Sequence, residues 1–405
     1  MKLALTVTTS LTALAIATSA FASDVTAQTV ALDTCNVLGV SGLTLSSDDT
    51  CLSISGIVEY AFEYEIDGAT GVGTPSSEVD WELQFEAITQ SDIGAASAVL
   101  VFTPEDPAVV GGPIIVDEAY VTIGDTTVLT AGLAPTMMPQ VGRDQYILSN
   151  LSVSRPGGHV IQLESLIAEG LVAGIALEDL EDDGTLAGFI EYEGDSIEAT
   201  AGGLVYNIYD IIDLGAAAEW ALYADLLIEY DTTEFFAAFV AENDELEFVS
   251  SVGVELDDLL LKSAYGFAYD WPTNVFEHAF GIGFEKGPID FEIEFITLDF
   301  ADLGINVDVA YELNADMEAE LELAFEDVTT HADIEGTLTL TTELTETLEL
   351  ETWAGLEYVA ATTTTLFGGG TEITYEPGGG FETSASLEGW SNGDLIVGFS
   401  AEKEF

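Results

Sequence analysis

Carboxylates are the side chains of this sequence that could do chemistry, and in three stretches they recur at every second residue. The full chain has 74 Asp plus Glu against 6 Lys plus Arg, and its formal charge is −68. The alternating carboxylates that we select are Glu59, Glu63, Glu292, Glu294, Glu318, Glu320 and Glu322, the last five on adjacent predicted strands. Paired carboxylates can transfer protons, but acid pairs are so abundant here that none stands out as a catalytic dyad. A wall lined with carboxylates, which would attract cations, is the simpler interpretation.

Other residues with catalytic or metal-binding potential are few. His159, His278 and His331 are scattered along the sequence, and Cys35 and Cys51 are its two cysteines. Gly-x-Ser-x-Gly, His-Glu-x-x-His and phosphate-binding glycine motifs do not occur, and two cysteines without clustered partners seldom form a zinc site. We therefore predict no enzymatic activity, no metal site and no cofactor.

The alternation predicts strands rather than helices. In residues 54–66, 289–300 and 316–327 apolar side chains alternate with acidic ones, which gives a strand one apolar and one acidic face. A helix would place the same glutamates on every side. Runs of about ten residues, the length of a tilted membrane strand, continue with turn signals between them to the end of the chain. We count about 22 runs, or about 16 if the weakly alternating stretches near 158–178 and 207–231 are merged or discarded.

These runs predict an all-β fold, a transmembrane antiparallel β-barrel with an even number of strands over residues 51–405. The chain is 48% hydrophobic and 10% aromatic, which excludes the disorder that a high net charge otherwise indicates. A soluble β-sandwich with an aromatic tail is the alternative. The unrelieved alternation disfavours it, because only half the strands of a sandwich would carry this much outward acid.

The two ends of the chain indicate export and a lipid environment. Residues 1–22 contain a lysine, an apolar stretch without acids and small residues at Ala20 and Ala22, which are features of a signal peptide. A membrane anchor is the alternative, disfavoured because the apolar stretch is short. At the other end, alternation places Phe405 on the apolar side of the last strand, and a terminal Phe of this kind looks like the sorting signal of bacterial outer-membrane barrels.

The cysteines flank the predicted start of the barrel. In an exported protein we expect Cys35 and Cys51 to form a structural disulfide, which stabilises by up to about 3 kcal/mol for a loop of this length. Residues 23–50 are then an N-terminal periplasmic segment that precedes the first strand.

Two segments resemble alphaproteobacterial outer-membrane porins. The segment 32–64 has a cysteine pair and a Cys-Leu-x-Ile-x-Gly opening strand, and the segment 118–135 looks like the hairpin before the constriction loop of such porins. The resemblance covers about fifty residues. It implies homotrimers of 16-stranded barrels that pass small hydrophilic solutes.

A candidate constriction loop follows the second motif. Residues 136–159 form the longest non-alternating stretch after the first strand, and they contain Arg143, Asp144 and Arg155. Arg143 and Arg155 are the two arginines of the chain, and their guanidinium groups could pair with wall carboxylates and hold the loop inside the barrel. An extracellular loop with ordinary surface arginines is the alternative.

The function that follows is passive diffusion through an acidic, water-filled pore in the bacterial outer membrane. If the apolar faces point to lipid, most strand carboxylates point inward, and rings of Asp and Glu select cations. We expect outer-membrane lipid and small cationic or neutral solutes as partners, and no nucleic acid, which the charge repels. The alternatives are a substrate-specific channel, and a structural or adhesive barrel with a filled lumen.

Overall fold

The computed structural model describes residues 35, 43–46, 50–107, 109, 112–139, 157–214, 217–257, 259–298, 302–326 and 333–405. Within these residues the fold is antiparallel β-sheet with one short helix, α2 (Ile208–Leu214), between two strands. The strands are β1 (Leu43–Ser46), β2 (Thr50–Ile66), β3 (Gly73–Ser91), β4 (Gly94–Pro104), β5 (Ile114–Gly124), β6 (Thr127–Ala134), β7 (Gly158–Ala168), β8 (Leu171–Glu178), β9 (Thr185–Glu193), β10 (Ile197–Tyr206), β11 (Glu219–Tyr230), β12 (Thr233–Glu242), β13 (Glu245–Leu256), β14 (Leu259–Asp270), β15 (Val275–Lys286), β16 (Ile289–Leu298), β17 (Asp302–Asn314), β18 (Met317–Glu326), β19 (Asp333–Thr345), β20 (Leu348–Val359), β21 (Thr364–Tyr375), β22 (Phe381–Trp390) and β23 (Leu395–Glu404).

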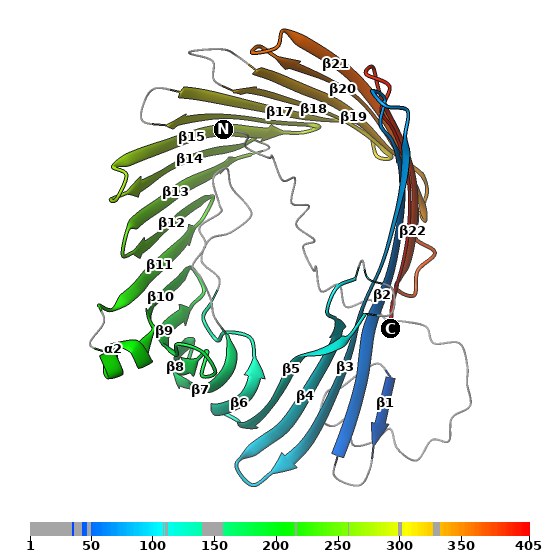
Figure 1. The fold of residues 1–405 in the computed structure, drawn as a ribbon. Coiled ribbons are helices and arrows are strands. Elements are labelled where there is room, and N and C mark those ends of the chain that lie inside the picture. The colour runs from blue at the N-terminus through cyan, green and yellow to red at the C-terminus, as the bar shows by residue number, and fades with distance from the viewer. Residues whose placement is uncertain are drawn as a thin grey trace.

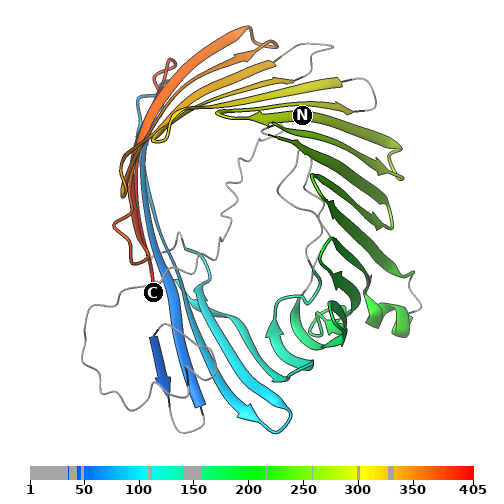
Figure 2. The same ribbon diagram turned by 180° about the vertical axis from the view of Figure 1, so that it is seen from behind.

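Strands β2 to β23 form a closed barrel of 22 antiparallel strands (Figures 1 and 2). Each strand pairs with the next one along the chain, and β23 pairs back onto residues 57–66 of β2. The count equals the upper number from the sequence and corrects the 16 strands that the porin resemblance implies. The stretches that the lower count discards are real strands: 158–178 forms β7 and β8, and 207–231 contains β11. Their alternation is weak because both of their faces carry apolar residues.

The registers divide the barrel wall into two chemically different faces. Directly opposed residues of antiparallel strands point to the same side of a sheet. On β16 to β19 one such row is wholly apolar and consists of Phe291, Val309, Leu321 and Leu338. Leu338 is 52% exposed, so this row lies on the surface. An exposed apolar face around a closed barrel is the face that lipid covers, and we assign it as the outer face.

The two ends of the barrel differ in how their strands are connected. On the end that holds the C-terminus, neighbouring strands are joined by short turns, as between β11 and β12 and between β13 and β14. Asp231 and Asp257 in these turns have φ values of 55° and 57°, a conformation that Asp tolerates better than most residues. The connections at the other end include the longer ones, such as that between β6 and β7. Short turns at the periplasmic end and longer loops at the outside are typical of outer-membrane barrels.

The C-terminal residue closes the barrel against β2. The backbone N–H of Phe405 donates to the carbonyl of Gly56, and the N–H of Gly56 donates to the carbonyl of Phe405, both at 3.0 Å. Gly56 precedes the exposed Val58 by two residues and shares its outward side. Phe405 is 50% exposed and lies on the outer face, as the alternation predicts, whereas its role as a sorting signal stays a prediction.

Strand β1 continues the same edge of β2 beyond the C-terminus. It pairs antiparallel with β2 from Leu43 opposite Ile54 to Ser46 opposite Cys51. The edge of β2 is therefore occupied by β23 up to Phe405 and by β1 directly after it.

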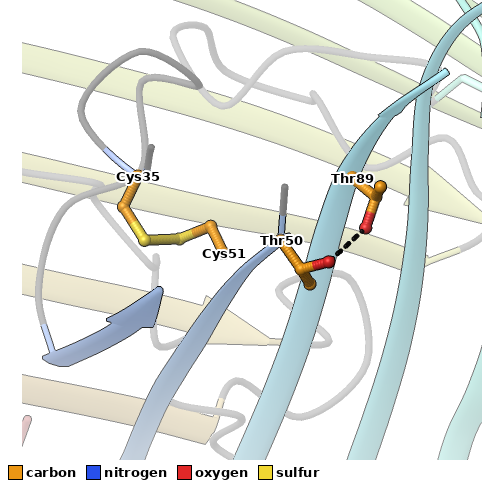
Figure 3. Close-up of a disulfide and its surroundings, with 4 residues drawn as sticks. All are labelled: Cys35, Thr50, Cys51 and Thr89. Carbon is orange, nitrogen blue, oxygen red and sulfur yellow. Dashed lines mark hydrogen bonds between the residues drawn. A yellow bond between two sulfur atoms is a disulfide. The ribbon is translucent and has the colours of Figure 1, made fainter. Parts of the chain in front are cut away.

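The predicted disulfide joins Cys35 to Cys51 at the start of β2, with a Cα–Cα distance of 5.0 Å (Figure 3). Both cysteines are buried, and the hydroxyl groups of Thr50 and Thr89 lie 3.0 Å apart, which links the start of β2 to β3. The disulfide prediction is confirmed. The residues that precede Cys35, including the predicted signal peptide 1–22, lie outside the described residues.

The contact between Gly56 and Phe405 predicts that a side chain at position 56 impairs barrel closure. A Cβ there would lie 2.4 Å from the carbonyl oxygen of Glu82 and 3.0 Å from Cζ of Phe405. We expect Gly56→Ala to destabilise the barrel by about 1–3 kcal/mol, because a crowded site must shift backbone. The measurement is the temperature at which the folded, fast-migrating form is lost on SDS gels.

Gly389→Ala is the matched control, since it is also a strand glycine and its Cβ would meet nothing closer than Leu395 Cδ1 at 3.7 Å. Equal loss of the folded form in both variants would contradict a specific role for Gly56.

Candidate functional site

The candidate site is the inner face of the barrel, where the predicted carboxylates come together. Five of them lie on this face of β16 and β18, namely Glu292, Glu294, Glu318, Glu320 and Glu322. From the sequence we expected these two strands to be adjacent. That expectation is wrong, because β17 lies between them. It adds Asp308, which lies directly opposite both Glu292 and Glu322. It also adds Asn306, whose Nδ2 donates a hydrogen bond of 2.9 Å to Glu294 Oε2.

A single row of opposed residues connects these carboxylates to β2. It crosses seven strands in the order Glu318, Thr341, Glu351, Glu372, Ser386, Gly398 and Glu63. Because each step joins residues on the same side, Glu63 shares a face with Glu318. All seven carboxylates selected from the sequence therefore belong to one face of the sheet.

Glu59 lies in a second group of acids where the barrel closes. It is opposite Asp80 on β3 and Glu402 on β23, and Glu402 is in turn opposite Glu382 on β22. Four neighbouring strands thus place a carboxylate at the same level of the inner wall. Like charges this close raise the electrostatic free energy of the folded barrel unless cations accompany them.

Lys262 on β14 is a cation of the inner face that the sequence did not single out. Its Nζ lies 3.6 Å from Glu292 Oε1 and 3.8 Å from Asp290 Oδ2, two strands away. Gly283 on β15 lies between Lys262 and Glu292, and a Cβ there would be 3.0 Å from Cγ of Glu292. Because Gly283 has no side chain, Lys262 can extend across β15 and reach Glu292 on β16.

The inner face changes character toward β8. The row that contains Glu294 continues through Gly281, Ala264, Ser251 and Phe236 to Leu227 on β11. The inner residues of β8 to β13 form a buried apolar cluster with Met138, and we call this part of the wall the apolar arc: Ala176, Ala187, Phe189, Leu204, Ala221, Tyr223, Leu227, Phe236, Ala238, Val240 and Val249. In Figure 1 these green strands lie across the ring from β2 and β22. One side of the interior is therefore acidic and the other apolar.

The segment after β6 packs on the apolar arc. Met138 is buried, and the hydroxyl of Tyr223 lies 4.0 Å from its sulfur. Met137 packs close to Phe189 above Gly174, where a Cβ would be 2.3 Å from Cε of Met137. Residues 136–139 thus leave β6 along the inner wall.

Glu178, at the end of β8, holds both ends of the long connection between β6 and β7. Its Oε1 accepts hydrogen bonds from the Thr136 hydroxyl at 3.0 Å and the Met137 N–H at 3.1 Å. Its Oε2 accepts from the Gly157 N–H at 3.3 Å, and Gln162 Nε2 lies 3.4 Å from Oε1. Glu178 is 0% exposed, so these donors replace water entirely. The sequence gives no signal for this role, because Glu178 is one of many acids and its partners lie 16 to 42 residues away.

The turn after Glu178 is also acidic. Asp179 N–H donates to the carbonyl of Gly157 at 2.8 Å. Desolvation, followed by the negative charges of Asp182 and Asp183, raises the pKa of Asp179 above its ordinary value. The predicted loop residues Arg143, Asp144 and Arg155 lie outside the described residues, as do positions 140–156 in general.

Among the described residues, no three His, Cys, Asp or Glu side chains gather in a way that could hold a metal ion. In those residues no helix combines the length and the apolar character needed to cross a membrane.

Comparisons with known proteins give remote structural likenesses. No known protein family and no curated protein matches the sequence. Among solved structures, a triple mutant of Rhodopseudomonas blastica porin is similar over 87% of this chain and 100% of its own, with 12% identity and a TM-score of 0.37. A loop-deletion mutant of OmpT, an outer membrane protein of Vibrio cholerae, is similar over 88% and 100%, with 11% identity and a TM-score of 0.36. At these TM-scores the likeness does not establish a shared fold, and the resemblance to the alphaproteobacterial porins stays a hypothesis.

The geometry of the barrel is sufficient to assign the protein to the bacterial outer membrane. A closed barrel with an even number of antiparallel strands, an apolar outer face and short turns at the end that holds the C-terminus is the architecture of bacterial outer-membrane proteins. The chain is therefore an outer-membrane β-barrel.

The hydrogen bonds of Glu178 predict that this residue positions the connection between β6 and β7. In Glu178→Gln an amide NH₂ replaces one acceptor oxygen and leaves a buried donor without a partner. We expect this to destabilise the folded protein by about 1–3 kcal/mol and to speed proteolysis between β6 and β7. Limited proteolysis of the folded protein, with mass spectrometry of the fragments, measures the effect.

Glu181→Gln is the control in the same corner of the barrel. Its carboxylate lies 3.1 Å from His159 Nε2, but its side chain is 70% exposed, so its loss changes little. Proteolysis of Glu178→Gln at the parental rate would exclude the positioning role.

Proposed function

We propose that this protein is an outer-membrane channel for passive, cation-preferring diffusion of small hydrophilic solutes. The observation that carries the proposal is the continuous row of opposed residues from Glu318 to Glu63, which gathers the carboxylates of β18, β20, β21 and β2 on one face. Carboxylates that line a water-filled lumen concentrate cations and repel anions. In the proposal Glu59, Glu63, Glu292, Glu294, Glu318, Glu320 and Glu322 line the pore.

A barrel of 22 strands needs a narrowing element if it is to select among ions. Barrel diameter grows roughly linearly with strand number, so the lumen is roughly 1.4 times as wide as that of a 16-stranded barrel. Fixed charges act on a mobile ion only within about 10 Å at 0.1 M ionic strength. We propose that residues 136–159 narrow the pore, because both described ends of this segment are held by Glu178 at the inner wall. Arg143 and Arg155 would then pair with wall carboxylates, and Asp144 would belong to the same constriction loop.

The remaining parts of the proposal concern processing and partners. Residues 1–22 would be removed as a signal peptide, and residues 23–50 would form a periplasmic segment tied to the barrel by the disulfide of Cys35. Outer-membrane lipid would cover the apolar face. A homotrimer is proposed from the porin resemblance alone. The proposed function requires no catalytic residue, cofactor or nucleic acid.

Two other functions remain as alternatives. A barrel with a filled lumen, serving a structural or adhesive role, would not conduct. A substrate-specific channel would conduct but would also bind a class of solute, and a pair of tryptophans on the inner wall favours that version.

Ion selectivity tests the proposal directly. Glu318→Gln, Glu320→Gln and Glu322→Gln together remove three inner charges and keep the side-chain size. We expect the reversal potential of purified protein in a planar bilayer under a KCl gradient to move toward zero, because the cation-attracting charge is reduced. The difference between parent and variant should shrink as salt increases, because salt screens the carboxylates.

The control is a triple variant in the short turns at the end of the barrel that holds the C-terminus. Asp195→Asn, Asp231→Asn and Asp257→Asn remove the same charge from short turns, and Asn tolerates the positive φ of the last two. An equal shift in both triple variants, or none in the inner one, would refute the placement of Glu318, Glu320 and Glu322 in the pore. A parent that inserts but does not conduct would favour a filled barrel.

A further inference from the structure

Two tryptophans lie side by side on the inner face of β20 and β22. The ring centroids of Trp353 and Trp390 are 5.7 Å apart, with an angle of 50° between the ring planes. Trp353 belongs to the row that runs through Thr339 to Glu320. Trp390 belongs to the row that runs through glycines and Thr337 to Glu322. Both indoles therefore share the face of the proposed pore-lining glutamates, and both are partly exposed.

Glycines form the floor beneath the two rings. On β21, between the tryptophan-bearing strands in Figure 1, a Cβ at Gly368 would lie 2.6 Å from the Trp390 ring. A Cβ at Gly370 would lie 2.5 Å from Trp353 Nε1, and one at Gly355 would be 3.2 Å from Cζ3 of the same ring. The absence of side chains at these three positions lets the indoles lie against the wall. Each ring thus covers backbone of the inner wall, and each stays partly exposed.

Carboxylates surround this floor. The indole N–H of Trp390 donates to Glu388 Oε1, which fixes a carboxylate beside the ring. Glu388 is opposite Gly370, in the same row as Trp353. The next inner row on β20 and β21 carries Glu351 opposite Glu372.

The charge of these carboxylates is not neutralised by a cationic side chain of the same strands. In the described residues of β18 to β23 the one Lys or Arg is Lys403. It lies opposite Val58 on the outer face, and its Nζ donates to the carbonyls of Gly379 and Glu404.

We infer that Trp353 and Trp390 form a binding site for organic cations of the quaternary ammonium class as they pass through the barrel. Indole faces attract cations through the ring quadrupole, and Trp is the strongest aromatic for this interaction. A quaternary ammonium ion has an apolar surface and a diffuse charge, so it can contact the rings while Glu351, Glu372 and Glu388 supply the opposite charge. The inference rests on the proposed channel function and names a solute class for it.

The test is block of the K⁺ current by choline in planar bilayers containing the purified full-length protein. We expect choline to reduce the current of the parent at a lower concentration than in Trp353→Leu with Trp390→Leu. Loss of the aromatic faces should raise the half-blocking concentration on the order of tenfold. Trp353→Phe with Trp390→Phe keeps two aromatic faces and should give an intermediate value. It also provides a testable variant if the leucine pair does not fold, as judged by heat-modifiable mobility on SDS gels.

Trp81→Leu is the matched control, because Trp81 lies opposite Val58 on the outer face and its replacement should leave choline block unchanged. Equal half-blocking concentrations in the parent and in both double variants would overturn the inference. The inference would also be overturned if glucose blocked the current in a way that depends on the two tryptophans and choline did not, since the rings would then bind neutral sugars. The KCl reversal potential from the same membranes separates the two proposals. A parent protein without cation preference refutes the pore proposal. A parent protein that prefers cations, but whose block by choline does not depend on the tryptophans, refutes this inference alone.

Discussion

Hydrogen bonding between β2 and β23 is the constraint on which the rest of the barrel depends. In lipid an unpaired backbone N–H or C=O costs several kcal/mol, so a sheet that enters a membrane must leave no edge. Once the sheet is closed, every strand residue points either outward to lipid or inward. The period-two pattern of the sequence is the direct consequence, because a chain with 74 acids can fold in a membrane only if nearly all of them are kept off the outer face.

The sequence predicts the fold well where that separation is complete. The stretches 289–300 and 316–327 alternate over most of their length and contain β16 and β18. Prediction is weak at 158–178 and 207–231, and the apolar arc explains why. Where the inner wall also carries apolar residues such as Ala176 and Tyr223, apolar side chains occur on both faces and the alternation that marks a strand disappears. The lower strand count came from these stretches.

The site could be predicted only in part, for a related reason. Alternation assigns a residue to a face, but which residues meet across strands depends on register, which the sequence does not state. The side of each glutamate could therefore be inferred, whereas the opposition of Asp308 to Glu292 could not. The role of Glu178 and the contact between Trp353 and Trp390 could not be predicted, because the residues involved are distant in sequence and become neighbours only when the strands are aligned.

The position of β1 bears on how the alignment at the closing pair is fixed. A slip of β23 by one residue would turn all its side chains to the opposite face, so the chemistry of the two faces excludes it. A slip by two residues keeps every face unchanged and is not excluded in that way. It would, however, place Phe405 opposite Ile54, a position where Leu43 of β1 already pairs. Strand β1 thus occupies the part of β2 that β23 would need, and it sterically prevents β23 from shifting register toward the start of β2.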